Sequence, residues 1–270
     1  MSPALLRRFG RDTLWIAIAS VAAILVFEVF FIRAISEIDL SALKTLINIG
    51  FVNNVLSALL GTNVEGALSA TTVATLGYVH PVLLVICTGY LTTECSRSLV
   101  GEIDRGSADV LLSLPISRLN IYVSVTAVWV LVASILCLMP GTGIWLATRF
   151  IQLYEPVDAT RFFQLAPNFF LLLLAIGAIT MLMSSFMIRR GFVIASVVAY
   201  IVASFLLNYL TTFWSDIEIV ANLGLLQHYQ PLVQMREGAF PQADMAVLVI
   251  IAMVAWTVGL FFYTRRDVPA

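Results

Sequence analysis

Residues 168–213 read NFFLLLLAIGAITMLMSSFMIRRGFVIASVVAYIVASFLLNYLTTF, two apolar runs that Arg189, Arg190 and Gly191 separate. Each run has about 20 residues, the length that an α-helix needs to cross a bilayer core of about 30 Å. The three residues between the runs leave room only for a tight turn. We therefore expect two antiparallel transmembrane helices, over 168–188 and 192–213.

Four further stretches of this kind predict helices over 14–35, 79–100, 121–147 and 245–263. Only 11% of the residues are charged, against about a quarter in soluble proteins. Uninterrupted apolar runs argue against a membrane β-barrel, whose strands alternate apolar and polar residues. We therefore expect an all-α polytopic membrane protein with six transmembrane helices, in which residues 1–270 form a single transmembrane domain.

The distribution of Lys and Arg sets the expected orientation. Six spans put both termini on one side, and that side collects ten basic residues: Arg7, Arg8, Arg11, Arg97, Arg105, Arg118, Arg189, Arg190, Arg265 and Arg266. Five lie on the other side: Arg33, Lys44, Arg149, Arg161 and Arg236. Because short loops rich in Lys and Arg stay in the cytoplasm, we expect a plasma (inner) membrane protein whose termini are both cytoplasmic.

Three regions at the edges of the spans have patterns of their own. Residues 1–12 place apolar side chains against arginines, which is typical of a short helix in the membrane interface, although a frayed tail is the alternative. Residues 36–77 form an extracytoplasmic segment too long to lack structure of its own, and an amphipathic helix is expected in it. Pro140 predicts a bend or break in the third span.

The chain lacks the common motifs of a catalyst. A phosphate-binding loop of the GxxxxGK[ST] type is absent, and Lys44 is the only lysine. His80 and His228 stand in no metal-binding spacing, and no GxSxG turn occurs. We therefore expect no enzyme, no metal site and no cofactor in this chain, and no nucleic-acid partner. An intramembrane protease that assembles its residues from separate helices stays open.

Two carboxylates, Glu28 and Glu94, lie inside predicted spans, where an ionisable side chain is costly and is a functional candidate by default. For Glu94 we favour an ion pair with Arg97, one helical turn further on. Glu28 has no basic residue at that spacing, so it either lines an interior cavity or reaches towards the surface. If both carboxylates take part in ion coupling, the chain is a proton- or ion-coupled secondary transporter.

The loop between the second and third spans, GEIDRGSADVLLSLPISRLN at 101–120, carries the densest cluster of charge in the chain. Residues 101–118 resemble the stretch that follows the second span in ATP-binding-cassette permeases of the type-2 exporter class: a glutamate, Arg-Gly-Thr, a Leu-rich run and Leu-Pro-Val-Ser-Arg. Here Ser107 replaces the commoner threonine, and Asp109 stands about where a glutamate is usual. The segment 228–238, with its aromatic-Pro and Gly pattern, and the ending at 261–267 are also similar to that family.

The resemblance implies a six-helix half-transporter that pairs with a second permease copy, in a homodimer or a heterodimer. It also implies a cytoplasmic ABC ATPase subunit as partner, which would bind the ATP and Mg²⁺. The 101–120 loop would then contain a coupling helix that docks on the ATPase. Carried over, the coupling residues are Glu102, Arg105, Gly106, Leu112, Pro115 and Arg118. A non-transporting membrane scaffold or maturation factor that works with an ATPase is a further alternative.

Overall fold

The computed structural model describes residues 3–37, 69–104, 117–153, 155–211, 214 and 217–266, and all regular structure in these ranges is helical. Six helical stretches in them are long and apolar enough to cross a membrane: Leu5–Ser36, Ala70–Ser98, Arg118–Phe150, Ala159–Phe186, Arg190–Thr211 and Gln242–Arg265. The prediction of an all-α protein with six such stretches is confirmed. This architecture is that of a multi-pass membrane protein.

The first span is a single unbroken helix, α1 (Pro3–Ser36). We expected residues 1–12 to form a separate interfacial helix, but residues 3–12 continue into the span without a break. Leu5 and Phe9 are buried in the hydrophobic core. The apolar face of this segment therefore packs on the bundle as the first turns of α1.

The second span consists of two helices, α4 (Ala70–Val79) and α5 (Pro81–Ser98). Pro81 has no backbone N–H, so it fits the first turn of a helix but not its interior. His80 ends α4 and caps α5, because its Nδ1 accepts a hydrogen bond from the backbone N–H of Val82 at 3.2 Å. The span thus begins at 70 and not at 79 as expected, and residues 38–68 of the expected outer segment 36–77 lie outside the described residues.

The third span is also interrupted, as predicted. Its parts are α8 (Arg118–Leu136) and α9 (Met139–Phe150), with Pro140 in the first turn of α9. The two helices therefore meet just before the proline. Breaks in the second and third spans give the bundle four shorter helical segments in place of two long ones.

The other elements complete the bundle. After α5 comes the short α6 (Val100–Asp104), and the 3-10 helix η1 (Ala159–Leu165) leads into α10 (Ala166–Phe186). Then follow α11 (Arg190–Thr211), α12 (Glu218–Ala221), η3 (Leu225–His228), α13 (Pro231–Glu237) and α14 (Gln242–Arg265). Both α10 and α11 begin and end two residues before the predicted positions.

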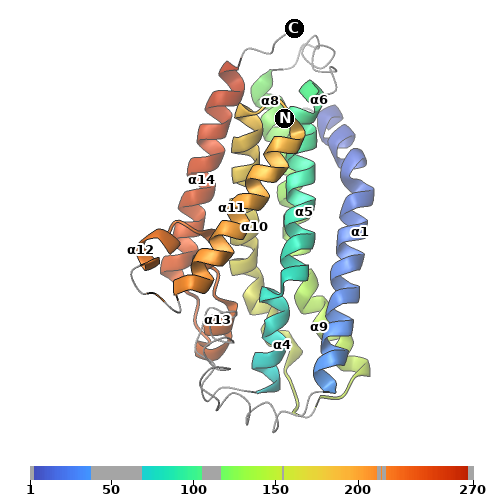
Figure 1. Ribbon diagram of the computed structural model, residues 1–270. Helices are drawn as coiled ribbons and strands as arrows, with labels where there is room; N and C mark the ends of the chain where they lie inside the picture. Colours follow the sequence, from blue (N-terminus) through green and yellow to red (C-terminus); the bar gives the residue numbers. More distant parts are fainter. Residues whose placement is uncertain are drawn as a thin grey trace.

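The most deeply buried span is α10, which packs against α14, α5 and α11, while α1 packs against α8, α9 and α5 (Figure 1). Small residues allow these close contacts. A Cβ atom at Gly177 of α10, for example, would lie 2.6 Å from Cζ3 of Trp129 on α8. Figure 1 also shows that α1 begins and α14 ends at the same end of the bundle.

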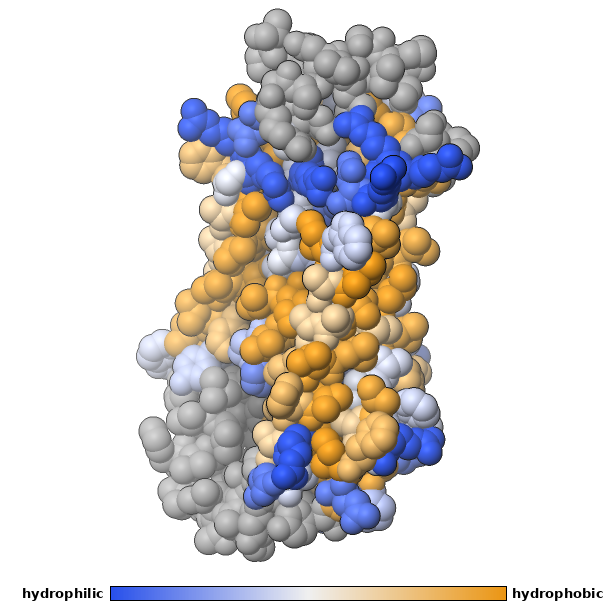
Figure 2. Space-filling model, turned by 90° about the vertical axis from the view of Figure 1, so that its right-hand side faces the viewer, coloured by the Kyte–Doolittle hydropathy of each residue, from blue (hydrophilic) through white to orange (hydrophobic). Residues whose placement is uncertain are grey.

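Apolar side chains form a belt around the bundle, and hydrophilic ones gather in a dense band at one end of the face shown in Figure 2. We name the end where α1 begins the arginine-rich end. Among the described residues it holds Arg7, Arg8, Arg11, Arg97, Arg118, Arg189, Arg190, Arg265 and Arg266. The opposite end holds Arg33, Arg149, Arg161 and Arg236.

Candidate functional site

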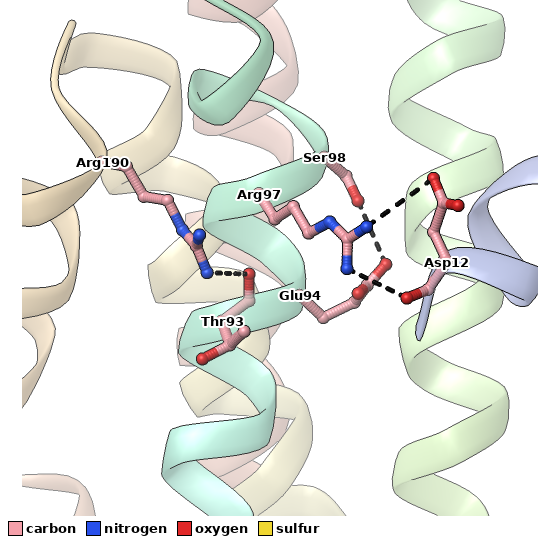
Figure 3. Close-up of polar contacts among 6 residues, drawn as sticks. All are labelled: Asp12, Thr93, Glu94, Arg97, Ser98 and Arg190. Carbon is pink, nitrogen blue, oxygen red and sulfur yellow. Dashed lines mark hydrogen bonds and ion pairs between the residues drawn. The ribbon is translucent and has the colours of Figure 1, made fainter. Parts of the chain in front are cut away.

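A cluster of polar side chains surrounds the last turns of α5 at the arginine-rich end (Figure 3). Arg97 of α5 donates from Nη1 to the backbone carbonyl of Asp12 on α1 at 2.9 Å, and its Nη2 lies 3.9 Å from Asp12 Oδ2. The guanidinium therefore binds both the backbone and the carboxylate of α1. This contact fixes the end of α5 against α1.

On the other side of α5, Arg190 holds the start of α11. Its Nε donates to Ser96 Oγ at 3.2 Å and its Nη2 to the carbonyl oxygen of Thr93 at 3.3 Å. Arginine is suited to such a contact because its planar fork donates in several directions at once. The last turns of α5 are thus bonded to two other spans (Figure 3).

Glu94 lies between these two contacts and is 1% exposed. Its Oε1 accepts a hydrogen bond from Ser98 Oγ at 3.0 Å, and its Oε2 has no hydrogen-bond partner in the described part of the chain. The expected ion pair between Glu94 and Arg97 is therefore corrected. Arg97 reaches outward to Asp12, while Glu94 turns inward and bonds to its own helix.

The predicted coupling residues fall mostly on the segment that joins α6 to α8. Arg105, Gly106, Leu112 and Pro115 lie outside the described residues. Glu102 is in the middle of α6, and its side chain likewise lies outside what the structure describes. Both attachment points of this segment, α6 and the start of α8, are at the arginine-rich end.

The Ser-Arg pair of the resembling motif has structural roles at the start of α8. Ser117 Oγ accepts a hydrogen bond from the backbone N–H of Asn120 at 3.2 Å, which makes it the N-cap of α8. Arg118 donates to the backbone carbonyl of Arg266, just past the end of α14. Arg118, predicted as a docking residue, therefore also ties α8 to the end of the last span.

Arg266 extends this connection to α10. Its guanidinium donates to the carbonyl oxygens of Met187 at 2.8 Å and Ser184 at 3.3 Å, at the C-terminal end of α10, where carbonyls lack partners within the helix. Burial lowers the pKa of this guanidinium from its ordinary value, yet arginine stays protonated in proteins. In the sequence, Arg266 counted towards the positive-inside bias and the family-like ending at 261–267, and no contact was predicted for it.

A second candidate site surrounds Glu28 in the half of the bundle away from the arginine-rich end. Glu28 is fully buried, and neither of its carboxylate oxygens has a hydrogen-bond partner among the described residues. Gly77 of α4 and Gly143 of α9 lie against it: a Cβ atom would be 2.7 Å from Glu28 Oε2 at Gly77 and 2.6 Å from Glu28 Cβ at Gly143. The alternative in which Glu28 reaches the surface was wrong.

The structure does not bring Glu28 and Glu94 together. Sixteen residue steps of α1 separate Asp12, which contacts Arg97, from Glu28, roughly 24 Å at about 1.5 Å per residue. The described residues also contain no group of three or more His, Cys, Asp or Glu side chains that could hold a metal ion. As a site for an ion, Glu28 therefore offers one carboxylate, which suits a proton better than a metal.

Buried polar groups link the short segments at this end. Tyr78 Oη donates to the carbonyl oxygen of Phe162 at 3.0 Å, and Tyr229 Oη donates to that of Tyr78 at 3.2 Å. Gln234 Nε2 donates to the carbonyl oxygen of Gln164 at 2.7 Å. Burial raises the pKa of Tyr229 well above its ordinary value, so its hydroxyl stays protonated. These bonds hold α4, η1 and α13 together.

The segment 228–238, the second part of the resemblance, contains the last residue of η3, the turn that follows it, and all of α13 with the glycine that ends it. His228 Nδ1 lies 2.8 Å from Asp244 Oδ1, and Pro231 occupies the first turn of α13. Gly238 ends α13 at φ 68°, a left-handed conformation that glycine adopts without steric cost. Pro231 and Gly238 therefore mark the start and the end of α13, on the side of the bundle away from the arginine-rich end.

Comparison with known proteins adds no family to this description. No protein-family model matches the chain, and no curated protein matches it either. The class that the structure supports is therefore the multi-pass membrane protein with six apolar helices.

Proposed function

We propose that the chain is the membrane-spanning subunit of an ATP-driven exporter and that a separate cytoplasmic ATPase drives it. The observation that carries the proposal is the charged segment 101–120, whose flanking helices, α6 and α8, place both of its ends at the arginine-rich end. The resemblance of residues 101–118 to type-2 exporter permeases supports the same role. In this proposal the arginine-rich end faces the cytoplasm, in agreement with the positive-inside rule.

The contacts around this segment suit the transmission of movement. At its start, α5 is bonded to α1 through Arg97 and to α11 through Arg190. At its end, α8 is bonded through Arg118 to the chain after α14, and Arg266 continues to α10. An ATPase that shifted the segment would therefore move several spans together, as a rigid-body transition requires. A second permease copy would complete the pathway between two such bundles.

The test is ATPase stimulation by charge-reversed variants. The tagged full-length chain is purified from native membranes, and the proposal expects a soluble protein with a Walker A motif to co-purify. Arg105→Glu and Glu102→Arg should abolish the stimulation of that ATPase in proteoliposomes without lowering the thermal midpoint of the permease. Arg161→Glu is the matched control, because Arg161 is exposed at the opposite end.

Retention of wild-type stimulation by both Arg105→Glu and Glu102→Arg would refute the coupling assignment. Arg118→Glu is a weaker test, because that change also breaks the bond to Arg266. ATPase stimulation without ATP-dependent movement of any solute would instead support the scaffold or maturation factor.

The burial of Glu28 supports a second candidate, a proton-coupled secondary transporter. A buried ionisable group inside a span, without a hydrogen-bond partner among the described residues, is the kind of residue on which proton coupling depends. This candidate expects a pH jump to drive proton flux in liposomes that contain the chain alone, measured with an entrapped pH-sensitive dye. Glu28→Gln should abolish that flux. Wild-type flux that Glu28→Gln leaves unchanged would exclude Glu28 as the coupling residue.

A further inference from the structure

An apolar groove of about 700 Å³ lies between α1 and α8. Its lining on α1 runs from Leu6 to Leu25, 19 residue steps or roughly 28 Å at about 1.5 Å each. This length exceeds the thickness of one leaflet, about 15 Å or half of the hydrocarbon core. Thr13 is the polar exception in the lining, and its hydroxyl donates inward to Tyr90 Oη at 3.1 Å. The groove therefore has the length and the chemistry to accept an acyl chain.

Small residues make the groove, and larger apolar side chains stand beside it. Gly10 and Ala17 of α1 and Ala127 of α8 leave room between the helices. Leu14 of α1 is 49% exposed and Leu131 of α8 is 65% exposed. In a span, such surface faces either lipid or another helix.

Two arginines lie on the same face of α1 as the groove, at its arginine-rich end. Arg7 and Arg11 precede Leu14 and Ile18 by one heptad, the spacing that returns a helix to the same face. Both arginines are exposed, and neither has a hydrogen bond or an ion pair within the described part of the chain. The neighbouring Asp12 contacts Arg97. The groove thus ends at two cations that have no anionic partner among the described residues.

We propose that this groove binds an anionic phospholipid, with an acyl chain along α1 and the headgroup phosphate at Arg7 and Arg11. Guanidinium groups bind phosphate through paired N–H donors, and juxtamembrane basic residues favour anionic lipids. The site goes beyond the proposed exporter function, since it would tie the position of α1 to the lipid composition of one leaflet. α1 carries Glu28 and the Asp12 contact with α5, so the lipid would act on both candidate sites.

A second copy of the chain fits this groove less well. A two-fold axis along the membrane normal brings the same heights of the two copies together, so Arg7 and Arg11 would face their own counterparts. Four like charges at one contact repel each other, whereas a lipid phosphate attracts the two arginines of a single copy. The charge pattern therefore favours a lipid over a symmetric pair of α1 helices.

The test measures lipid binding to the purified full-length chain by native mass spectrometry. Phosphatidylglycerol and phosphatidylcholine with the same acyl chains are the two probes. Arginines near a membrane surface each contribute about fivefold to the binding of anionic lipid. The double variant Arg7→Gln, Arg11→Gln should therefore weaken phosphatidylglycerol binding about 25-fold and leave phosphatidylcholine binding nearly unchanged. Arg189→Gln removes a charge at the same end, away from the groove, and should have little effect.

A second variant tests the groove itself. Gly10→Leu should reduce binding of both lipids, because a Cβ atom at Gly10 meets nothing within 4 Å and the added side chain can fill the groove without an internal clash. Gly89→Leu on α5 is the matched control, since Gly89 is exposed and equally free of neighbours. The proposal fails if the double variant keeps its preference for phosphatidylglycerol, or if Arg189→Gln lowers binding as much. It also fails if Gly10→Leu dissociates a dimer and leaves lipid binding intact.

Discussion

Replacement of Gly143 by alanine should force α9 away from α1. The new Cβ would lie 2.6 Å from Cβ and 3.0 Å from Cγ of Glu28, and 3.8 Å from Cα of Leu25. Carbon atoms pack at about 3.5–4.0 Å, so the nearest pair is roughly 1 Å too close. The Cβ of Glu28 is fixed to the backbone of α1 and cannot rotate out of the way. Relief therefore requires a shift of one helix against the other.

The size of the effect follows from two opposing contributions. Overpacking of this kind costs about 1–3 kcal/mol of unfolding free energy. Alanine in place of glycine in a helix raises the unfolding free energy by about 1 kcal/mol. Gly89→Ala on α5 gives the second contribution alone, because a Cβ atom there meets nothing within 4 Å. The two variants should therefore differ by about 1–3 kcal/mol, with Gly143→Ala the less stable.

The assay is thermal unfolding of both variants in the same detergent, followed by helical circular dichroism. At about 2–4 °C per kcal/mol for a chain of this size, Gly143→Ala should unfold roughly 2–12 °C below Gly89→Ala. Glu28→Ala should shift the midpoints of the Gly143→Ala and Gly89→Ala backgrounds by similar amounts, because it keeps the Cβ that lies 2.6 Å from the new methyl group at position 143. Equal midpoints for Gly143→Ala and Gly89→Ala would show that α1 and α9 do not pack as closely as the structure has them.

Three other substitutions test single contacts through the same midpoints. Glu28→Met should raise the unfolding free energy by about 1–3 kcal/mol, because it removes a buried carboxyl group that lacks hydrogen bonds; a loss of stability would reveal a partner for that group. Arg190→Met should lower it by about 1.5–3 kcal/mol through loss of the charged hydrogen bonds to α5, whereas Arg189→Met, at an exposed position, should change little. Tyr78→Phe should lower it by about 1–3 kcal/mol, since the carbonyl oxygen of Phe162 would lose its buried donor, and an unchanged midpoint would contradict that bond.

The six spans could be predicted because length and hydropathy alone identify them. The start of the second span could not, because residues 70–78 contain threonines that lower the hydropathy of that stretch. In the structure Thr75 Oγ1 donates to the carbonyl oxygen of Thr71 at 2.8 Å, so its hydroxyl is satisfied within the helix. Pro81 carries the same break signal as Pro140, but the predicted span began only two residues before it, where a proline is expected.

The residues of the candidate sites could be predicted from the sequence, but their contacts could not. A carboxylate within a span is visible in the sequence, so Glu28 and Glu94 could be selected. Their surroundings depend on packing between helices: Gly77 and Gly143 come from α4 and α9, and the partner of Arg97 is on α1. Opposite charges three or four residues apart on a helix often pair, so the sequence predicted Glu94 as the partner of Arg97. The structure shows that the partner is Asp12, on another span.

The two ends of the bundle differ in a way that bears on movement. At the arginine-rich end, guanidinium groups join the ends of whole spans to one another, and such charged hydrogen bonds resist separation. At the other end the second and third spans are broken into α4, α5, α8 and α9, and the junctions fall at His80 and before Pro140. Junctions between short helices can change angle more easily than a continuous helix can bend. A force applied at the arginine-rich end should therefore pass along α5 and α8 as rigid bodies and change the angles at these junctions. Glu28, packed between Gly77 and Gly143 on α4 and α9, lies where such a change would first open space.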